Sequence, residues 1–467
     1  DLLHNWGSVN LFTRPRRFGK SLNMSMLEHF FSLNGDKSIF NGLEISKETV
    51  LCKEYMGKYP VLSISLKEIS SLSYEAAFQM AVQILKRVPA KVQYLLESDA
   101  LSEQDKAEYR KLLDDNMSEA VFSSSLRVLS ELLEKHHGTK VILLIDEYDV
   151  PLAKAYANGY YDQMLSLIRS LLGEALKTNN SLKFAVLTGC LRISKESIFT
   201  GLNNLKVLTV ADERFDEYFG FTDKEVRELL EYYDVADHYE EVKRWYDGYQ
   251  FRQFKHVYNP RSVVAAMKSR HFSNYWTSTE TYEALKIYMD MDFDGLRSDI
   301  VRMLGEERIA VNTHSFQNDM QTFKTKDDVL TLLVHLGYLG YDADQKEVFI
   351  PNREIAGEFE NAMSVGGWTE VMNVLKASEK FLQDTLCLDA ESVAKGLDRA
   401  HTEVASVLTY NDENSLGCAI SLAYYSARKD YRMVRELPAG RGFADVVFLP
   451  LPSVDKPALV VELKYDK

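Results

Sequence analysis

Residues Val9–Ser21 read VNLFTRPRRFGKS, and this stretch decides the first part of the fold. The apolar run Val9–Thr13 predicts a buried β-strand, and the residues after the stretch predict a helix. Between strand and helix stand the three residues Gly-Lys-Ser at positions 19–21. Backbone N–H groups at such a junction point toward an anion, so the stretch predicts a phosphate-binding loop of the Walker A type.

The loop side chains suit a nucleoside triphosphate with Mg²⁺. Lys20 would reach the β- and γ-phosphates, and Ser21 would bind Mg²⁺. The loop residues expected to contact ATP are Arg16, Arg17, Phe18, Gly19, Lys20 and Ser21. The motif G-x-x-x-x-G-K-[ST] places a glycine where this chain has Arg14, which restricts the entry of the loop. The competing interpretation is a basic turn that carries Gly-Lys by accident.

A second motif has the features of a Walker B strand. The run Val141–Asp149 reads VILLIDEYD, and continuous apolar residues are typical of a buried parallel strand. Asp146 would hold Mg²⁺ through water, and Glu147 would orient or deprotonate the attacking water. Solvated turn residues are the alternative, but two motifs in the correct order on one predicted sheet favour the nucleotide site.

A third strand, Phe184–Thr188, ends in a polar residue. Thr188 stands where a sensor of the γ-phosphate would lie, and Arg192 would supply positive charge to the transition state. A Thr-Gly turn and a surface arginine are the alternative interpretation of these two residues.

The first 210 residues alternate strands and helices, which predicts a parallel sheet with crossover helices. In the predicted helix after the first strand, four apolar residues should share one face. They are Leu22, Met26, Phe30 and Phe31. The strands expected in this part are Val9–Thr13, Val61–Leu66, Val141–Asp146, Phe184–Thr188 and Val207–Val210.

From Phe221 onward, helical patterns dominate. Thr222 and Glu225 predict a capping box at a helix start. Asp327–Leu339 predicts a helix that ends near Gly340, and Glu347–Ile350 predicts a short strand, which would suit a lid or a winged-helix-like module. A long helical stretch is expected over Thr369–Leu408.

Three strands close the chain, over Arg432–Leu437, Phe443–Leu449 and Ala458–Leu463. Strand periodicity places Glu462 and Lys464 on one face, where Asp445 on the adjacent strand would join them. Two carboxylates would hold Mg²⁺ and the lysine would position or activate a water, as in metal-assisted phosphodiester hydrolysis. The alternatives for an extra acidic group are Glu413 and Glu436. A degenerate fold that only binds its ligand is the competing interpretation.

Composition narrows the function classes. The chain has 467 residues, 46% of them hydrophobic, which indicates two to four folded domains. Its formal net charge of −14 argues against indiscriminate nucleic-acid binding, which would need a local basic patch. Four widely spaced cysteines suggest reduced, mostly buried thiols in a cytoplasmic protein rather than a zinc site. We find no membrane-spanning run and no secretory leader, and expect the natural N-terminus to lie upstream of Asp1.

Several motifs together resemble the bacterial AAA-ATPase-like family. They are Phe12–Ser21, Asp146–Asp149, Leu187–Gly189, Ser197–Asn204, Trp245–Tyr249 and Tyr258–Pro260. Arg14 in place of glycine is usual in that family. The resemblance implies an N-terminal ATPase and a C-terminal domain similar to PD-(D/E)XK nucleases.

We therefore expect an α/β protein with three parts. They are a P-loop (RecA/AAA-like) parallel-sheet domain over 1–215, a mainly helical lid or winged-helix-like module over 216–368, and a restriction-endonuclease-like α/β domain over 369–467 that is incomplete at its C-terminus. ATP and Mg²⁺ are the expected cofactors, with DNA or RNA as the candidate substrate and a homo-oligomer as the candidate assembly. The alternative is a nucleotide-regulated signalling or scaffolding ATPase whose C-terminal domain is a non-catalytic binding module.

Overall fold

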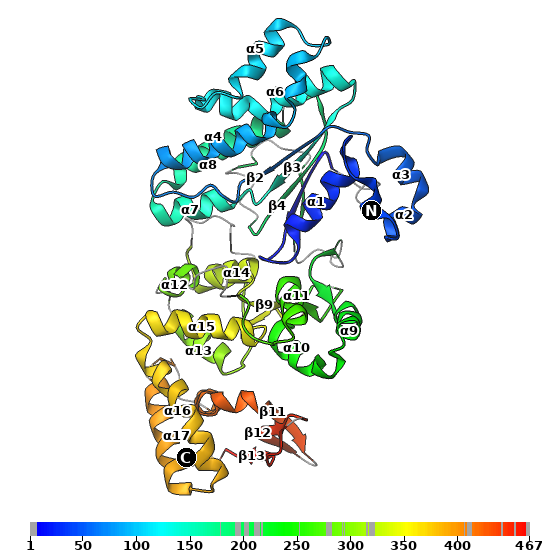
Figure 1. The fold of residues 1–467 in the computed structure, drawn as a ribbon. Coiled ribbons are helices and arrows are strands. Elements are labelled where there is room, and N and C mark those ends of the chain that lie inside the picture. The colour runs from blue at the N-terminus through cyan, green and yellow to red at the C-terminus, as the bar shows by residue number, and fades with distance from the viewer. Residues whose placement is uncertain are drawn as a thin grey trace.

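The computed structural model describes residues 7–463, apart from positions 178, 192–197, 200–204, 210–214, 216–217, 252, 277–282, 292, 294, 314–315, 317–322, 406, 409–412, 440–441 and 453. Figure 1 shows three parts stacked in chain order from top to bottom. We name them the sheet domain (7–209), the middle module (215–365) and the C-terminal module (369–463).

The sheet domain contains five parallel strands in the order β2-β3-β4-β1-β5. Their bounds are β1 Val9–Thr13, β2 Val61–Ser65, β3 Val141–Asp146, β4 Leu182–Gly189 and β5 Leu205–Leu208. The prediction of a parallel sheet is confirmed, and four of the strands lie where the apolar runs predict them. The fifth begins two residues before the predicted run Val207–Val210, whose last residue lies outside the described residues.

Alternation along β3 explains the layers on each side of the sheet. Leu143 and Ile145 belong to the core shared with α4, α6 and α8, whereas Ile142 and Leu144 pack into a second core with α1. A strand buried on both faces needs apolar residues at every position, which is why β3 reads as a continuous run. The helices of this domain are α1 Lys20–Phe31, α2 Glu44–Lys47, α3 Thr49–Tyr55, α4 Tyr74–Ala90, α5 Glu103–Lys111, α6 Glu119–His137, α7 Val150–Asn158 and α8 Tyr161–Leu176.

The predicted apolar face of α1 is wrong in part. Phe30 and Phe31 are buried, but Leu22 and Met26 are 66% and 39% exposed. The inward face of α1 starts instead at Lys20 and Met24. Residues two positions from Lys20 and Met24 lie roughly 200° around the helix and therefore face away from the sheet.

The middle module packs helices around two small sheets. Thr222 and Glu225 form the predicted capping box at the start of α9. The helix α14 ends at Leu336, with Gly337 as its C-cap at φ 89°, three residues before the expected end at Gly340. The predicted strand over Glu347–Ile350 is β10, and it pairs with both β8 and β9. The elements are β6 Phe221–Thr222, α9 Asp223–Tyr232, α10 Tyr239–Tyr246, β7 Val257–Tyr258, α11 Pro260–Ser269, α12 Glu283–Met289, α13 Leu296–Leu304, β8 Ile309–Ala310, α14 Lys326–Leu336, β9 Gly340–Asp342, β10 Glu347–Phe349 and α15 Arg353–Val365.

The C-terminal module places three helices beside an antiparallel sheet of order β11-β12-β13. The predicted helical stretch is two helices, α16 Thr369–Leu386 and α17 Ala390–Ala405. The third helix is α18 Glu413–Ala423. The three predicted strands are β11 Tyr431–Ala439, β12 Gly442–Pro450 and β13 Leu459–Val461.

The three parts share a hydrophobic core. One contiguous cluster of buried residues includes Leu143 of the sheet domain, Leu333 of the middle module and Phe448 of the C-terminal module. Among the described residues, no helix combines the length and apolar character needed to cross a bilayer. The four cysteines are free, and Cys190 and Cys418 are buried while Cys387 is exposed.

Candidate nucleotide-binding and C-terminal carboxylate sites

The Gly-Lys-Ser loop (residues 14–21) joins β1 to α1 at the carboxyl end of the sheet. Gly19 is the N-cap of α1 at φ 85°, and a Cβ there would meet nothing within 4 Å, so the requirement for glycine is conformational. The buried Lys20 Nζ donates to the carbonyl oxygens of Arg14, at 3.1 Å, and Pro15, at 2.9 Å. The loop therefore holds its lysine ammonium against backbone oxygens at the helix N-terminus, where an anion is favoured.

The ends of β3 and β4 and the start of α1 bring three oxygen ligands together here. Ser21 Oγ donates to Asp146 Oδ2 at 2.6 Å, and Thr188 Oγ1 donates to Asp146 Oδ1. The sheet order explains this meeting, because β4 lies between β1 and β3. The residues predicted as Walker A serine, Walker B aspartate and sensor thus form one hydrogen-bonded group of the hard oxygen ligands that Mg²⁺ prefers.

Glu147 follows Asp146 in a strained backbone. Its φ is 52°, in the left-handed region that non-glycine residues rarely adopt, and its N–H points to Thr188 Oγ1 at 3.4 Å. Burial raises the pKa of its carboxyl, while the charge of Lys20 acts in the opposite direction. A partly buried carboxylate with a raised pKa beside the ammonium of Lys20 suits general-base chemistry.

Asp149 is a site residue without a predicted role. Its buried Oδ2 accepts hydrogen bonds from the backbone N–H groups of Cys190 and Leu191, each at 2.8 Å. Burial raises the pKa of this carboxyl. The two bonds join the turn after β3 to the chain leaving β4, so Asp149 fixes the relative position of Glu147 and Thr188. The sequence signal was its place at the end of the DEYD stretch.

Arg14, which stands in place of the motif glycine, is fully buried and hydrogen-bonded to the backbone. Its Nη1 donates to the carbonyl oxygens of Thr13 and Leu208, both at 3.0 Å. Its guanidinium lies 4.9 Å from the ring centre of Phe219 and 5.7 Å from that of Phe251. The arginine thus ties the loop entry to β5 and to the middle module, which supports the loop in a way that glycine could not.

Residues 1–199 match a family profile described as "Predicted AAA-ATPase" (AAA-ATPase_like). We call this region the AAA-ATPase-like domain. It contains β1 to β4 of the five-stranded parallel sheet, which is consistent with a P-loop fold. The chain is also 25% identical over 284 residues to a protein of Azotobacter chroococcum mcd 1 described as "Uncharacterized protein in vnfD 5'region". That match covers 59% of this chain and 48% of the relative, so the chain spans about half the length of that relative.

The C-terminal carboxylates lie at one end of the pairing between β12 and β13. The antiparallel pairs run from Phe448↔Leu459 to Val446↔Val461, and Asp445 and Glu462 are the residues just beyond the last pair. Asp445 belongs to β12, whereas Glu462 follows the last residue of β13. Glu462 is exposed, and Asp445 Oδ2 accepts a hydrogen bond from the N–H of Leu463 at 2.5 Å.

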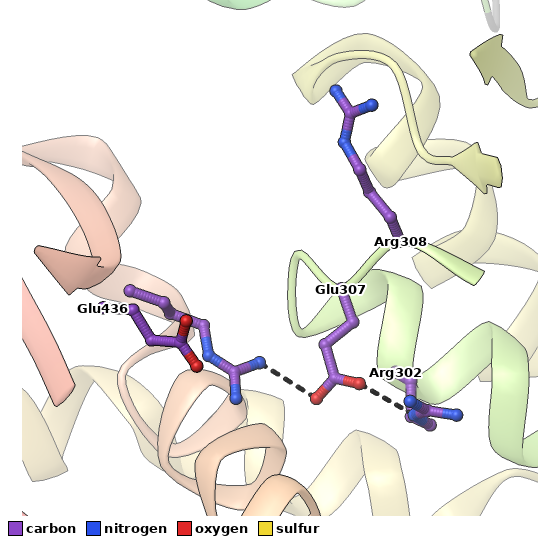
Figure 2. Close-up of a pocket in the computed structure, with 5 residues that line it drawn as sticks. Arg302, Glu307, Arg308 and Glu436 are labelled. Carbon is purple, nitrogen blue, oxygen red and sulfur yellow. Dashed lines mark hydrogen bonds and ion pairs between the residues drawn. The ribbon is translucent and has the colours of Figure 1, made fainter. Parts of the chain in front are cut away.

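Glu436 lies in β11, on the other side of β12. It lies between the pairs Arg435↔Val446 and Leu437↔Ala444, and therefore across from Asp445, at φ 50°. It also lines a cavity of about 230 Å³ between the middle module and β11, with Arg302, Glu307, Arg308 and Arg435. Figure 2 shows the ion pairs that join Glu307 to Arg302 and to Arg435 in this cavity.

Three of the predicted groups cannot be placed. Arg192 and Lys464 lie outside the described residues, and so does the side chain of Glu413. Within the described part of the chain, no group of three or more His, Cys, Asp or Glu side chains is arranged to hold a metal ion. The metal roles of Asp445 and Glu462 therefore remain predictions.

Proposed function

We propose that this protein binds ATP with Mg²⁺ in its AAA-ATPase-like domain and hydrolyses it. The observation that carries the proposal is the hydrogen-bonded group of Ser21, Asp146 and Thr188 beside Lys20, built from the start of α1 and the ends of β3 and β4. These residues fit the group chemically, since a lysine ammonium suits terminal phosphates and hydroxyl and carboxylate oxygens suit Mg²⁺.

In this proposal each side chain has a separate task. Lys20 binds the β- and γ-phosphates, and Ser21 and Asp146 hold Mg²⁺, which neutralises phosphate charge when bound. Glu147 accepts a proton from, or orients, the attacking water. Thr188 senses the γ-phosphate through its hydroxyl, and Arg192 is the proposed source of positive charge for the transition state. The backbone of residues 16–19 completes the phosphate contacts.

The first test is calorimetric titration with ATP and Mg²⁺. Lys20→Ala should weaken binding by about tenfold to a hundredfold, because charge-assisted bonds to the terminal phosphates are lost. Lys47→Ala, which removes an exposed lysine paired with Glu44, is the matched control and should bind as wild type does. Equal titrations for wild type and Lys20→Ala would rule the proposal out.

We further propose that the C-terminal module is a Mg²⁺-dependent nuclease acting on DNA or RNA, with Asp445 and Glu462 as metal ligands and Lys464 as the residue that activates water. The register of β12 and β13 supports it, because Asp445 and Glu462 are the residues just beyond the pair Val446↔Val461. The bond from the Leu463 N–H to Asp445 supports the competing proposal, in which this module binds without catalysis and the protein is a nucleotide-regulated signalling or scaffolding ATPase.

Nuclease assays on the full chain separate the two proposals. Asp445→Asn and Glu462→Gln should each abolish Mg²⁺- or Mn²⁺-dependent cleavage of single- and double-stranded DNA and RNA, while ATP binding persists. Asp455→Asn, an exposed carboxylate in the same module, is the control and should cleave normally. If wild type cuts none of these substrates with either metal, the binding-module proposal is preferred.

A further inference from the structure

The middle module packs directly onto the Gly-Lys-Ser loop. A Cβ at Gly337, the C-cap of α14, would lie 3.0 Å from Pro15 Cβ. The ring of Phe18 packs edge-on against Tyr249, with 4.8 Å between ring centres, and the Tyr249 hydroxyl donates to the Gly337 carbonyl at 2.8 Å. The loop therefore has the sheet on one side and the middle module on the other.

Arg17 makes the most specific of these contacts, with Trp276. Its guanidinium carbon lies 4.3 Å from the indole ring centre, and its Nη2 donates to the Trp276 carbonyl oxygen at 2.6 Å. The indole is fully buried. Arg17 also has φ 69°, in the left-handed region, so the surrounding structure must hold this loop residue in its conformation.

Glu354 fixes the backbone at Trp276 through hydrogen bonds. Its Oε1 accepts from the N–H groups of Tyr275, at 2.7 Å, and Trp276, at 3.0 Å, and its Oε2 accepts from Ser262 Oγ at 2.9 Å. The carboxylate is 1% exposed and belongs to the first turn of α15. A buried acceptor with three donors fixes the backbone of residue 276 and, through it, the indole that Arg17 covers.

We propose that Trp276 and Glu354 are positioning residues of the nucleotide site, because they hold Arg17 and thereby the conformation of the phosphate-binding loop. Nucleotide binding and the packing of the middle module on the loop are then energetically coupled. This inference rests on the proposed ATP site. It assigns a role to Trp276, which is 259 residues from Arg17 in sequence.

The coupling predicts effects in both directions, since linkage is reciprocal. Trp276→Ala should raise the Kd for ATP with Mg²⁺ by about tenfold, and Trp276→Phe should recover part of the loss because phenyl is a weaker cation–π partner. ATP should slow amide hydrogen exchange in α14 and α15 of wild type, and Trp276→Ala should remove that protection although the residue has no predicted contact with nucleotide.

Two sets of variants separate positioning from general packing. Arg17→Gly permits the left-handed backbone but lacks the guanidinium, so it should weaken ATP binding as much as Arg17→Ala does. The double variant Arg17→Ala/Trp276→Ala should bind ATP no more weakly than either single variant. Trp368 lies between α15 and α16, and Trp368→Ala removes the same kind of contact there, because the guanidinium carbon of Arg297 lies 4.7 Å from the Trp368 ring centre. It is the matched control and should keep the wild-type Kd.

The outcomes are distinguishable from failure of the proposed function. If wild type binds ATP in a Lys20-dependent way while folded Trp276→Ala and Arg17→Gly keep its Kd, the positioning role is wrong and the ATP site stands. Equal weakening by Trp368→Ala would likewise overturn it. If wild type and Lys20→Ala give the same titration, the ATP site and the positioning role fall together.

Discussion

At the scale of single residues, Glu147 combines a left-handed backbone with a raised carboxyl pKa. Its backbone is in a costly conformation and its pKa is raised by burial, and both features would be disadvantages in an ordinary turn. They are expected of a carboxylate aimed at a water beside the γ-phosphate. Glu147→Gln should therefore bind ATP normally and hydrolyse it at least about 100-fold more slowly. Single-turnover assays with ATP and Mg²⁺ measure this, and unchanged turnover would remove Glu147 from its role.

Thr188 offers a second residue-scale prediction. Its hydroxyl donates to Asp146, and the isosteric Thr188→Val removes this donor from a buried site. We expect slower hydrolysis, by about tenfold or more, because Asp146 loses a partner that orients it. Thr188→Ser restores the hydroxyl and should restore most of the rate. A valine variant as active as wild type would contradict any role of the Thr188 hydroxyl in hydrolysis.

At the scale of elements, the sequence predicted strands better than helix faces. Strands buried on both sides read as mostly apolar runs, so β1, β3 and β4 could be located from the sequence pattern. The edge strand β2 alternates apolar and polar residues, which is also a strand pattern. The apolar face of α1 could not, because Leu22 and Met26 share its apolar character while the buried lysine sets which side faces inward. The end of α14 was predicted near Gly340 but lies before Gly337, because either glycine could have ended the helix.

The candidate site divides in the same way. Asp146 and Thr188 lie at strand ends, and Lys20 and Ser21 begin the helix that follows β1. The carboxyl ends of parallel strands lie at one edge of a sheet, which was enough to predict a common site for these residues. Trp276 and Glu354 could not be predicted, because their contact with the loop depends on how a distant module folds back on it. No local pattern at positions 274–276 or 352–356 carries that information.

Gly337 allows an element-scale test of this packing. Gly337→Ala has to pay for a left-handed alanine and for the approach of its Cβ to Pro15, together about 1–3 kcal/mol of folding stability. Gly159 is the C-cap of α7 at φ 81°, and a Cβ there would meet no atom within 4 Å. Gly159→Ala therefore loses stability only through its left-handed backbone. Urea unfolding should find Gly337→Ala the less stable of the two, and only Gly337→Ala should also weaken ATP binding. Equal stabilities would exclude a tight contact at Pro15.

At the scale of the whole molecule, Glu354 links stability to pH. Burial raises the pKa of its carboxyl from an ordinary 4.5 to about 7, although hydrogen bonds and the charge of Arg17 act against this. Between these values the folded chain binds a proton that the unfolded chain has released, so the free energy of unfolding falls as pH rises from about 5 to about 7. A shift of this size corresponds to about 3 kcal/mol.

Glu354→Gln removes that titration and retains most of the hydrogen-bonding shape. Wild type should therefore lose about 3 kcal/mol relative to Glu354→Gln between pH 5 and pH 8, and the difference should level off above pH 8. Urea unfolding of both proteins across this range measures it, and other titrating groups cancel because the two chains share them. Parallel pH profiles would show that Glu354 does not titrate in this range.

The place of β1 in the sheet also bears on how the protein is made. The strand before the Gly-Lys-Ser loop has β4 and β5 as its neighbours, and they follow about 170 and about 190 residues later in the chain. At a synthesis rate of about 5–20 residues per second, β1 waits roughly 8–34 s on the ribosome before either partner exists. During that interval its apolar edges are unpaired and prone to aggregation. Nucleotide cannot stabilise the nascent chain until the sheet closes, so the growing polypeptide should depend on chaperones well beyond the completion of its first motif.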